Sequence, residues 1–378
     1  MPETAEQPVT WGFFLRVSIK GVFLFAICNL CFALIYPMQA LGNLSLYNRI
    51  LPPRTRLPYG ENPALWNNIS VMNLNAMFAS HVIQQATADD EFRVILLGDS
   101  NTWGFRLAHD ETLAAQMNQA QMTVGEQRVV AYNLGYPQLS LTKDLLILDE
   151  ALQYQPDLII WLVTLRSFAL EQQLLPELVL RHRQQIRSLI DTYNLSSNPN
   201  DSRFIEPNFW QRTIIGQRRN LADLLRLQSY GFAWSATDID QFIPDDYNLR
   251  QSDFEADLSW GDNYPEPLEL TQDDLAFDVL SAGFERSADI PIWIINEPMF
   301  ISDGDNSDLR YNSFYPRWAY DQYRVLLADF AQENNWHYVD WWDMVAPDDF
   351  TDSPVHLTTQ ATQQISRLLL DGLTKEAQ

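Results

Sequence analysis

Cysteine, histidine and basic residues are scarce in this chain of 378 residues. The two cysteines, Cys28 and Cys31, lie inside one apolar run, so they say nothing about the redox compartment of the rest of the chain. Lysine and arginine together number 25 against 49 acidic residues, which gives a formal net charge of −24. Because a field of that sign repels polyanions, we expect no nucleic-acid partner.

Long apolar runs are also rare, with one exception near the N-terminus. Residues 21–36 are apolar except for Asn29, and extending the run back to Trp11 adds only Arg16 and Lys20 as charged residues. A helix of about 20 residues spans a bilayer, and long cationic side chains near its end can reach the interface. The sequence therefore predicts one transmembrane helix.

The same run could instead be a cleaved signal peptide. The candidate cleavage site around residues 38–40 reads Met-Gln-Ala and lacks a small residue at its third-last position, so we favour a retained signal anchor. Arg16 and Lys20 favour a cytoplasmic N-terminus. We predict a single-pass protein of the cell membrane with its main domain outside the cytoplasm, although three cations on the other flank weaken the charge asymmetry: Arg49, Arg54 and Arg56.

The remainder of the chain alternates short apolar runs with longer helical segments. Runs that are apolar without interruption are typical of strands buried on both faces, as in a parallel sheet covered by helices. We therefore predict an α/β fold, a flavodoxin-like three-layer arrangement, with strands at residues 92–97, 129–134, 158–163, 290–295 and 336–341.

A serine lies where the first predicted strand should turn into a helix. Residues 98–104 read Gly-Asp-Ser-Asn-Thr-Trp-Gly. Glycine permits a tight bend, and N–H groups at the start of a helix can meet the negative charge that develops when a serine attacks a carbonyl. The simpler interpretation is that Asp99 or Ser100 is a helix N-cap.

Among the five histidines, only His356 has a carboxylate in its own loop before a helix. Asp352 precedes it, and a helical stretch is predicted from about residue 359 to 373. In a serine triad the histidine takes the proton while the acid fixes its tautomer and orientation. Alone, such a histidine is more often a surface or capping residue. The other four precede the first strand, follow the serine turn, lie in a basic helical run or lie on a strand: His81, His109, His182 and His337.

Together, these two segments resemble the SGNH (GDSL-type) hydrolase and acyltransferase family, whose serine block reads Gly-Asp-Ser and whose final block reads Asp-x-x-His. The resemblance covers scattered blocks between about residues 92 and 370. It implies Ser100 as nucleophile, His356 as general base and Asp352 as the orienting acid. The spacing here is one residue longer than in the family, which leaves Asp349 as the alternative acid.

The resemblance also implies an oxyanion hole built from backbone N–H groups of Ser100 and of a glycine after the second strand, here Gly135. The third family block, Gly-x-Asn-Asp, is absent, because residues 164–167 read Thr-Leu-Arg-Ser. Arg166 stands where the asparagine donor is expected. It could stabilise an oxyanion or hold an anionic group of a substrate, or it could form a structural ion pair.

Asn296 and Glu297 end the fourth predicted strand, at the sheet edge where ligands bind in open α/β folds. We expect Asn296 to replace the missing asparagine donor, and Asp99, Arg166 and Glu297 to lie beside the substrate. The alternative is that residues 296–298 form only a turn.

Between the third and fourth predicted strands lie many more residues than a crossover normally needs. We predict an insertion at about residues 170–286, helical at first, with a second helix at 220–230. Residues 237–274 are acidic with interleaved aromatics, and Arg250 is their only basic residue. We interpret this part as a cap beside the active site; a solvated acidic surface is the alternative. The chain then divides into a tail and anchor (1–41), a linker and extension (42–90) and the SGNH-like domain (91–378).

The resemblance implies a membrane-anchored serine esterase or O-acyltransferase that acts on acyl esters of cell-envelope glycans through an acyl-enzyme. Neither a metal nor another cofactor is expected. The anchor and the altered third block are similar to envelope acyl-transfer members of the family, which implies a multispanning membrane acyltransferase as a partner. The alternative is a catalytically silent SGNH-fold protein that serves binding or assembly in the envelope.

Overall fold

A computed structural model of the chain describes residues 10–60, 69–85, 90–241, 243, 247–261 and 263–376. In this part of the chain, six strands form one sheet in the order β2-β3-β1-β4-β5-β6. β2 is antiparallel to β3 and every other pair is parallel. Without β2, the chain order across the sheet is the flavodoxin-like 2-1-3-4-5. The predicted fold class is confirmed, with strands β1 (Glu91–Leu97), β2 (Thr123–Val124), β3 (Gln127–Asn133), β4 (Leu158–Val163), β5 (Ile292–Asn296) and β6 (His337–Asp340).

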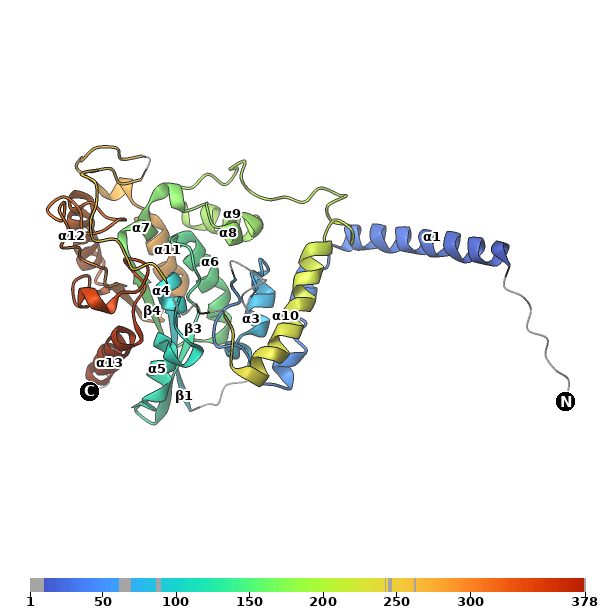
Figure 1. Cartoon of the computed structure of the whole chain (residues 1–378), viewed down its shortest axis with the longest axis horizontal. Helices are drawn as coiled ribbons and strands as arrows, with labels where there is room; N and C mark the ends of the chain where they lie inside the picture. The colour runs from blue at the N-terminus through green and yellow to red at the C-terminus, as the bar shows by residue number, and fades with distance from the viewer. Residues whose placement is uncertain are drawn as a thin grey trace.

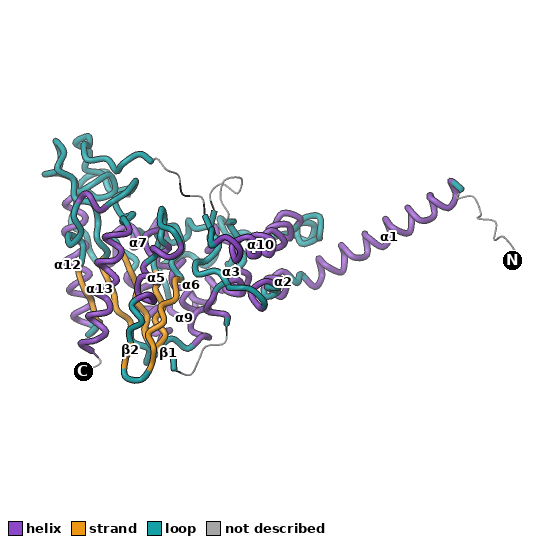
Figure 2. Tube along the Cα trace, turned by 60° about the horizontal axis from the view of Figure 1, so that its bottom comes forward, coloured by secondary structure: helices purple, strands orange, loops and turns teal. Residues whose placement is uncertain are grey.

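Helices cover both faces of this sheet (Figures 1 and 2). Those that contribute most to one face are α3 (Leu74–Ser80), α6 (Leu141–Ala151), α8 (Glu177–Arg181), α9 (Arg183–Tyr193), α11 (Phe277–Ser287) and α12 (Arg317–Glu333). The opposite face is covered by α5 (Leu113–Gln119) and α13 (Thr359–Glu376). The remaining helices are α1 (Trp11–Ile35), α2 (Met38–Gly42), α4 (Ser100–Trp103), α7 (Leu165–Phe168) and α10 (Arg218–Thr237).

Short 3-10 turns complete the described elements: η1 (Tyr47–Arg49), η2 (Val82–Gln84), η3 (His109–Glu111), η4 (Leu152–Tyr154), η5 (Leu170–Gln172), η6 (Gln272–Asp274) and η7 (Pro347–Asp349).

Strand β1 shows why the apolar runs are uninterrupted. Val94 and Leu96 pack into the core beneath α5 and α13, whereas Ile95 and Leu97 pack into the larger core on the other face. All four side chains are buried. Because successive side chains point to opposite faces and both faces are covered, every position must be apolar.

Helix α1 extends away from the body of the molecule (Figures 1 and 2). It is long and apolar enough to cross a membrane, and most of its side chains are exposed. Near its domain end, the Asn29 side chain accepts a hydrogen bond from the backbone N–H of Ile215 at 3.2 Å. The predicted N-terminal apolar helix is therefore present; residues 1–9 lie outside the described part.

The segment predicted as a linker is instead part of the folded body over its described residues. Leu57 and Phe78 belong to the larger core. The buried Arg56 guanidinium pairs with Asp240 and donates to the backbone oxygen of Gly104 at 2.9 Å. A buried cation needs such partners, and they fix this segment to the main domain. Residues 61–68 and 86–89 lie outside the described part, and the three-part division of the chain remains a prediction.

The insertion contains α8, α9 and α10, followed by a long loop. The second helix is longer than the predicted 220–230, because the helical pattern continues through Phe232 and Trp234 as far as Thr237. Of the acidic segment, residues 242, 244–246 and 262 lie outside the described part.

Candidate active site

The turn after β1 places Ser100 at the first position of α4. Gly98 has a φ of +152°, and a Cβ there would lie 2.2 Å from Thr102 Oγ1, so only glycine fits. Asp99 is the N-cap, and its Oδ1 accepts a hydrogen bond from Asn101 N–H at 2.8 Å. The capping interpretation thus holds for Asp99, and the same cap presents Ser100 at the carboxyl end of the sheet.

Lys143 fixes this turn to the loop that follows β3. Its Nζ is completely buried and donates to the backbone oxygens of Gly98 at 2.7 Å and Tyr136 at 2.9 Å. Asp144 balances the charge at 2.5 Å. A buried ammonium with three donors can hold two loops at a fixed separation. No local sequence pattern distinguishes Lys143 from other lysines.

His356 lies in a small hairpin that closes the last loop before α13. Phe350 and Leu357 form an antiparallel bridge, and Thr351 N–H donates to the backbone oxygen of His356 at 2.9 Å. The hairpin accommodates the extra residue between the acid and the histidine, because Asp352 Oδ1 still lies within hydrogen-bonding distance of His356 Nδ1.

These two loops bring the three predicted triad residues together. His356 Nε2 lies 2.9 Å from Ser100 Oγ, and His356 Nδ1 lies 2.9 Å from Asp352 Oδ1. Both distances are hydrogen-bonding distances, and the order serine, histidine, acid is that of a serine triad. Asp349 is not part of this chain of contacts; its Oδ1 accepts from Thr358 Oγ1 at 3.2 Å, at the start of α13.

Arg106, which the sequence analysis did not identify, binds the acid of this group. Its Nε donates to Asp352 Oδ2 at 2.7 Å. Burial alone would raise the pKa of Asp352, but the hydrogen bonds and charges of His356 and Arg106 outweigh it and hold that pKa well below its usual value. Asp352 is therefore a carboxylate at any physiological pH.

Phe105 stacks on the imidazole of His356, with ring centroids 4.8 Å apart and an interplanar angle of 27°. Phe105 and Arg106 follow Gly104, the C-cap of α4, so the short segment after the serine both covers the histidine and binds its acid. A lone aromatic or arginine in a loop carries no sequence signal for such a role.

Asp99 and Glu297 form a buried carboxyl pair and are not available to a substrate, contrary to the prediction. Both are almost completely buried, and Asn101 Nδ2 donates to Glu297 Oε2 at 3.1 Å. Burial, followed by the charge of Asp99, raises the pKa of Glu297 well above its usual value.

Asn296 is not retained as an oxyanion donor. Its Nδ2 donates to Asp340 Oδ1 at 2.8 Å, and its Oδ1 accepts from the hydroxyls of Tyr320 and Tyr323 at 3.3 Å. The side chain is completely buried. Its amide therefore serves to join β5 to β6 and α12.

Gly135 also differs from its predicted role. Its N–H donates to Asn133 Oδ1 at 3.1 Å, so this donor is already satisfied. A Cβ at residue 135 would lie 2.5 Å from the backbone nitrogen of Trp103, which shows that glycine is needed for α4 to pack closely. In the same loop, Gln138 is exposed and left-handed, with a φ of 96°. Left-handed backbone at a non-glycine residue is strained, and such strain clusters at functional sites.

Arg166 lies at the start of α7 with its guanidinium 4.9 Å from the ring centre of Phe314. It forms no ion pair with the acidic residues that the structure describes. The side chain is half-buried, so of the three residues predicted to bind substrate it is the one that remains accessible.

The acidic segment approaches the site where its described residues resume. The ring of Tyr247 lies 5.2 Å from the Arg106 guanidinium, and Arg250 N–H donates to the backbone oxygen of Thr351 at 3.2 Å. This part of the insertion therefore lies beside the hairpin that carries Asp352 and His356. Among the described residues, no group of three or more histidine, cysteine or acidic side chains could hold a metal ion.

No protein-family model and no curated protein matches the chain. Several solved structures are similar to it. A carbohydrate acetylesterase family member from Sinorhizobium meliloti is 12% identical, with a TM-score of 0.33 over 74% of this chain and 96% of the other. A member of the lipolytic protein G-D-S-L family from Veillonella parvula DSM 2008 is 12% identical, with a TM-score of 0.33 over 75% and 98%.

A lipase/acylhydrolase from Enterococcus faecalis is 12% identical, with a TM-score of 0.36 over 75% of this chain and 96% of the other. Identities and TM-scores this low say nothing about activity or substrate in this chain. The chain is similar to esterases and lipolytic proteins of the G-D-S-L type, the family that its serine and histidine blocks resemble.

Proposed function

We propose that the protein is a serine hydrolase that cleaves carboxylic esters. The observation that supports this is the continuous set of contacts from Ser100 Oγ to His356 and on to Asp352, each 2.9 Å long. A serine hydroxyl becomes nucleophilic when an adjacent base can take its proton, and an ionised acid on the far side of the imidazole holds the required tautomer.

In this mechanism Ser100 Oγ attacks the ester carbonyl carbon as its proton passes to His356 Nε2. The tetrahedral intermediate then collapses, the C–O bond to the alcohol breaks, and the alcohol leaves with the proton from Nε2. The acyl group stays on Ser100 until a second nucleophile attacks it with the same assistance from His356. Water as that nucleophile gives hydrolysis, and a glycan hydroxyl gives acyl transfer.

The negative oxygen of the intermediate requires hydrogen-bond donors. Ser100 N–H is one, because at the first position of a helix it has no helical acceptor. We assign the second donor to the backbone of Gln138, whose loop is clamped to the serine turn by Lys143. Arg166 is assigned to an anionic or strongly polar group of the substrate, because no described carboxylate neutralises it.

The proposed setting is the cell membrane, with α1 as a single-pass anchor and the hydrolase domain outside the cytoplasm. The support is the length and apolar character of α1, whose side chains are mostly exposed. An acylated glycan of the envelope is the proposed substrate, and a multispanning membrane acyltransferase is the proposed partner. Both follow from the family resemblance of the sequence.

Labelling with a fluorophosphonate probe tests the proposed nucleophile. The purified full chain should be labelled at Ser100, and both Ser100→Ala and His356→Ala should abolish labelling while the circular dichroism spectrum is unchanged. Thr358→Ala, which removes a hydroxyl from the same loop region outside the triad, is the matched control and should be labelled. A folded wild-type chain that reacts with neither the probe nor p-nitrophenyl acetate would instead favour the binding or assembly role.

A further inference from the structure

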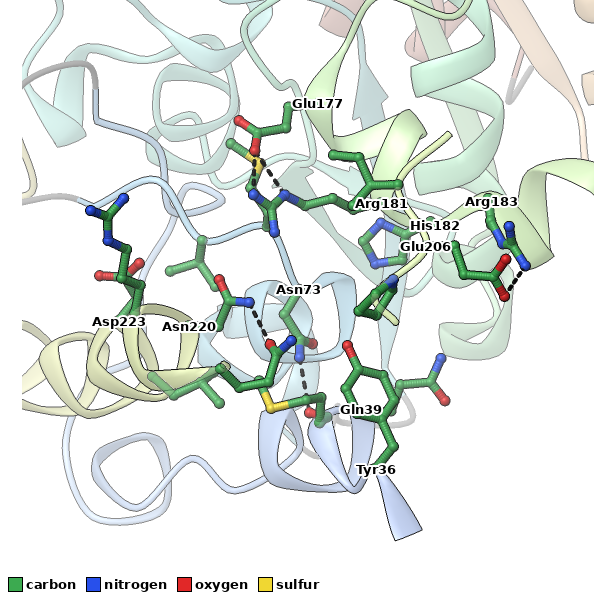
Figure 3. Close-up of a pocket in the computed structure, with 18 of the residues that line it drawn as sticks. Tyr36, Gln39, Asn73, Glu177, Arg181, His182, Arg183, Glu206, Asn220 and Asp223 are labelled. Carbon is green, nitrogen blue, oxygen red and sulfur yellow. Dashed lines mark hydrogen bonds and ion pairs between the residues drawn. The ribbon is translucent and has the colours of Figure 1, made fainter. Parts of the chain in front are cut away.

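A cavity lies on the side of the molecule where α1 joins the domain, and none of the residues proposed for catalysis lines it. It has a volume of about 530 Å³. Its walls come from the residue that ends α1, from α2, from residues 70–73 before α3, from α8, α9 and α10, and from the loop of residues 205–217, which we call the strap (Figure 3).

The charge of this cavity differs from that of the molecule as a whole. Four arginines line it, together with three carboxylates, whereas the whole chain carries a formal charge of −24. Each carboxylate already has its own arginine: Glu177 with Arg181, Glu206 with Arg183, and Asp223 with Arg226.

Two of the lining arginines therefore lack a carboxylate of their own. Arg212 reaches Glu206 only at 4.0 Å and otherwise donates to the backbone oxygen of Pro207 at 3.1 Å. Arg219 forms no ion pair within the part of the chain that the structure describes. A guanidinium has five N–H donors in a planar fork that suits phosphate, so both retain donors for an anion.

The amide side chains of Gln217 and Asn220 lie on the same wall, and Asn220 Nδ2 donates to Gln217 Oε1 at 2.6 Å. Apolar side chains complete the lining, among them Met38, Val71 and Leu224. A cavity with spare cationic donors, amides and apolar patches suits a ligand that has a phosphate and an apolar part.

The depth of the cavity places it at the level of lipid headgroups. About 20 helical residues cross the hydrocarbon core, so a span that ends with α1 at Ile35 begins near Arg16, and Arg16 and Lys20 then lie towards its cytoplasmic end. Tyr36, which lines the cavity, is the next residue after α1. The cavity therefore opens in the polar layer of that leaflet, which is about 5–7 Å thick.

The surface around the cavity also fits a membrane. The strap exposes Trp210 at 73%, Ile215 at 55% and Phe209 at 40% next to α1. One end of helix α10 lies beside the domain end of α1, and α10 runs away from it at a steep angle (Figure 1). Its exposed positions include Leu225 and Phe232 and carry no acidic residue. Aromatic and apolar side chains beside a spanning helix are typical of the bilayer interface.

We propose that this cavity binds the phosphate of a membrane phospholipid headgroup, with Arg212 and Arg219 as its charged donors. The inference rests on the proposal that α1 crosses the membrane. It gives the strap and α10 a role, because a bound lipid would hold this face of the domain at a fixed height and orientation on the bilayer.

The test is a titration of the full chain in detergent with dioctanoyl phosphatidylglycerol, followed by native mass spectrometry. We expect one lipid per chain. The double variant Arg212→Gln with Arg219→Gln should weaken binding about a hundredfold, because each charge-assisted hydrogen bond to phosphate contributes about tenfold or more. The double variant Arg128→Gln with Arg367→Gln removes the same charge from remote exposed sites and should leave affinity unchanged.

Titrations with inorganic phosphate and with glycerol phosphate, done in the same way, distinguish a lipid headgroup from a free phosphate compound as the ligand of the cavity. Lipid binding that is lost in the cavity variant and partly restored by Arg212→Lys with Arg219→Lys supports the proposal. Binding of inorganic phosphate without binding of the lipid would overturn it, and so would lipid binding that is equal in both double variants. Fluorophosphonate labelling should be the same in all these variants, so failure of the lipid site is distinguishable from failure of the proposed hydrolase.

Discussion

Arg106 links the turn that carries Ser100 to the loop that carries Asp352. Its backbone is left-handed, with a φ of 72°, and its guanidinium binds Asp352 while lying against the ring of Tyr247. One side chain thus joins the segment after Ser100, the final loop and the insertion. Groups that contact the acid of a triad from outside hold the imidazole in place through it.

Replacing Arg106 with alanine should slow the reaction and also lower the stability of the fold. The two side chains of the ion pair are only 19% and 17% exposed, so its loss should cost about 1–3 kcal/mol of stability. Loss of the contact frees Asp352, and a small displacement of the imidazole is costly, so the rate of fluorophosphonate labelling should fall about tenfold or more. Labelling kinetics and thermal unfolding of the same sample measure the two effects.

Arg128→Ala is the matched control for this change. It removes an arginine from an ion pair with Glu91 at the amino end of β3, whereas Ser100 lies at the carboxyl end of the sheet. It should leave the labelling rate unchanged. A fall in melting temperature that is proportionate to the fall in labelling would show Arg106 to be merely structural.

His81 gives the fold a pH dependence of defined sign. Burial lowers the pKa of this completely buried histidine to about 4, whereas the unfolded chain has a value of about 6.5. Between these values the unfolded state binds a proton that the folded state does not, so stability falls as the pH falls from 6.5 towards 4. At pH 5 this histidine alone should cost about 2 kcal/mol relative to pH 7.5.

The variant His81→Gln has no such proton to take up. Urea unfolding of the full chain at pH 7.5 and pH 5 should show a loss of stability in the wild type that is larger by about 2 kcal/mol than in the variant. Other titrating groups contribute equally to both proteins and cancel in the difference. Equal losses would mean that His81 is not buried as a neutral imidazole.

Helix α4 has only four residues, so its position depends on what packs against it. The loop at Gly135 packs against α4 at Trp103. Asn133 binds both sides of this contact, because its Nδ2 donates to the backbone oxygen of Trp103 at 3.2 Å while its Oδ1 accepts from Gly135 N–H. The absence of a side chain on Gly135 is what permits the close approach.

The substitution Gly135→Ala should displace α4 and with it Ser100. The new Cβ would meet backbone atoms at 2.5 and 2.8 Å, which cannot rotate away as a side chain can. Overpacking of this kind costs about 1–3 kcal/mol, and misplacement of the nucleophile should slow probe labelling about tenfold to a hundredfold.

Gly125→Ala separates loss of stability from displacement of α4. Gly125 lies between β2 and β3 with a φ of +60° and open space around it, so alanine there costs only backbone strain of about 1 kcal/mol. Labelling should be unchanged in this control. If both variants are labelled at the wild-type rate, the close contact does not position the serine.

The larger elements could be predicted from the sequence because their signals are local. β4 has the predicted bounds, and the other four predicted strands differ by only one or two residues at either end. β2 was missed because two residues carry no pattern, and its pairing with β3 depends on the intervening turn. The segment before β1 was predicted as a linker because it contains prolines. The burial of its Arg56 against Asp240 depends on a residue far away in the sequence.

The residues of the site likewise divide into those with a local sequence signal and those whose contacts depend on distant residues. Ser100, Asp352 and His356 were identified because each lies in a short motif of defined spacing, and the structure brings them within hydrogen-bonding distance. Asn296, Gly135 and Glu297 were assigned by their position after a strand. Position at a strand end does not reveal which neighbours a side chain will bind, and here Asp340, Asn133 and Asn101 bind them. Arg106 and Lys143 act through contacts with distant backbone or side chains, which no local pattern indicates.

Over the whole molecule, charge and apolar surface are unevenly distributed. The chain carries 24 more acidic than basic residues, yet α1 has no acid and the exposed positions of α10 have none either. An acidic body repels anionic lipids, so attachment to a membrane must come from apolar surface and from the local arginines around α1. The strap and α10 therefore supplement α1 and do not replace it.

The full chain should remain with the membrane after extraction with alkaline carbonate, which removes peripheral proteins. Val22→Lys combined with Phe25→Lys places two cations near the centre of the proposed span, where each costs about 2.5–3.5 kcal/mol, and should move much of the protein to the soluble fraction. Leu249→Lys changes an equally exposed apolar residue of the insertion and should not. If a chain whose N-terminus begins after residue 40 is found in the soluble fraction, α1 is a cleaved signal peptide. Cleavage would remove the contact of Asn29 with the strap, and the strap would then have no partner at this position.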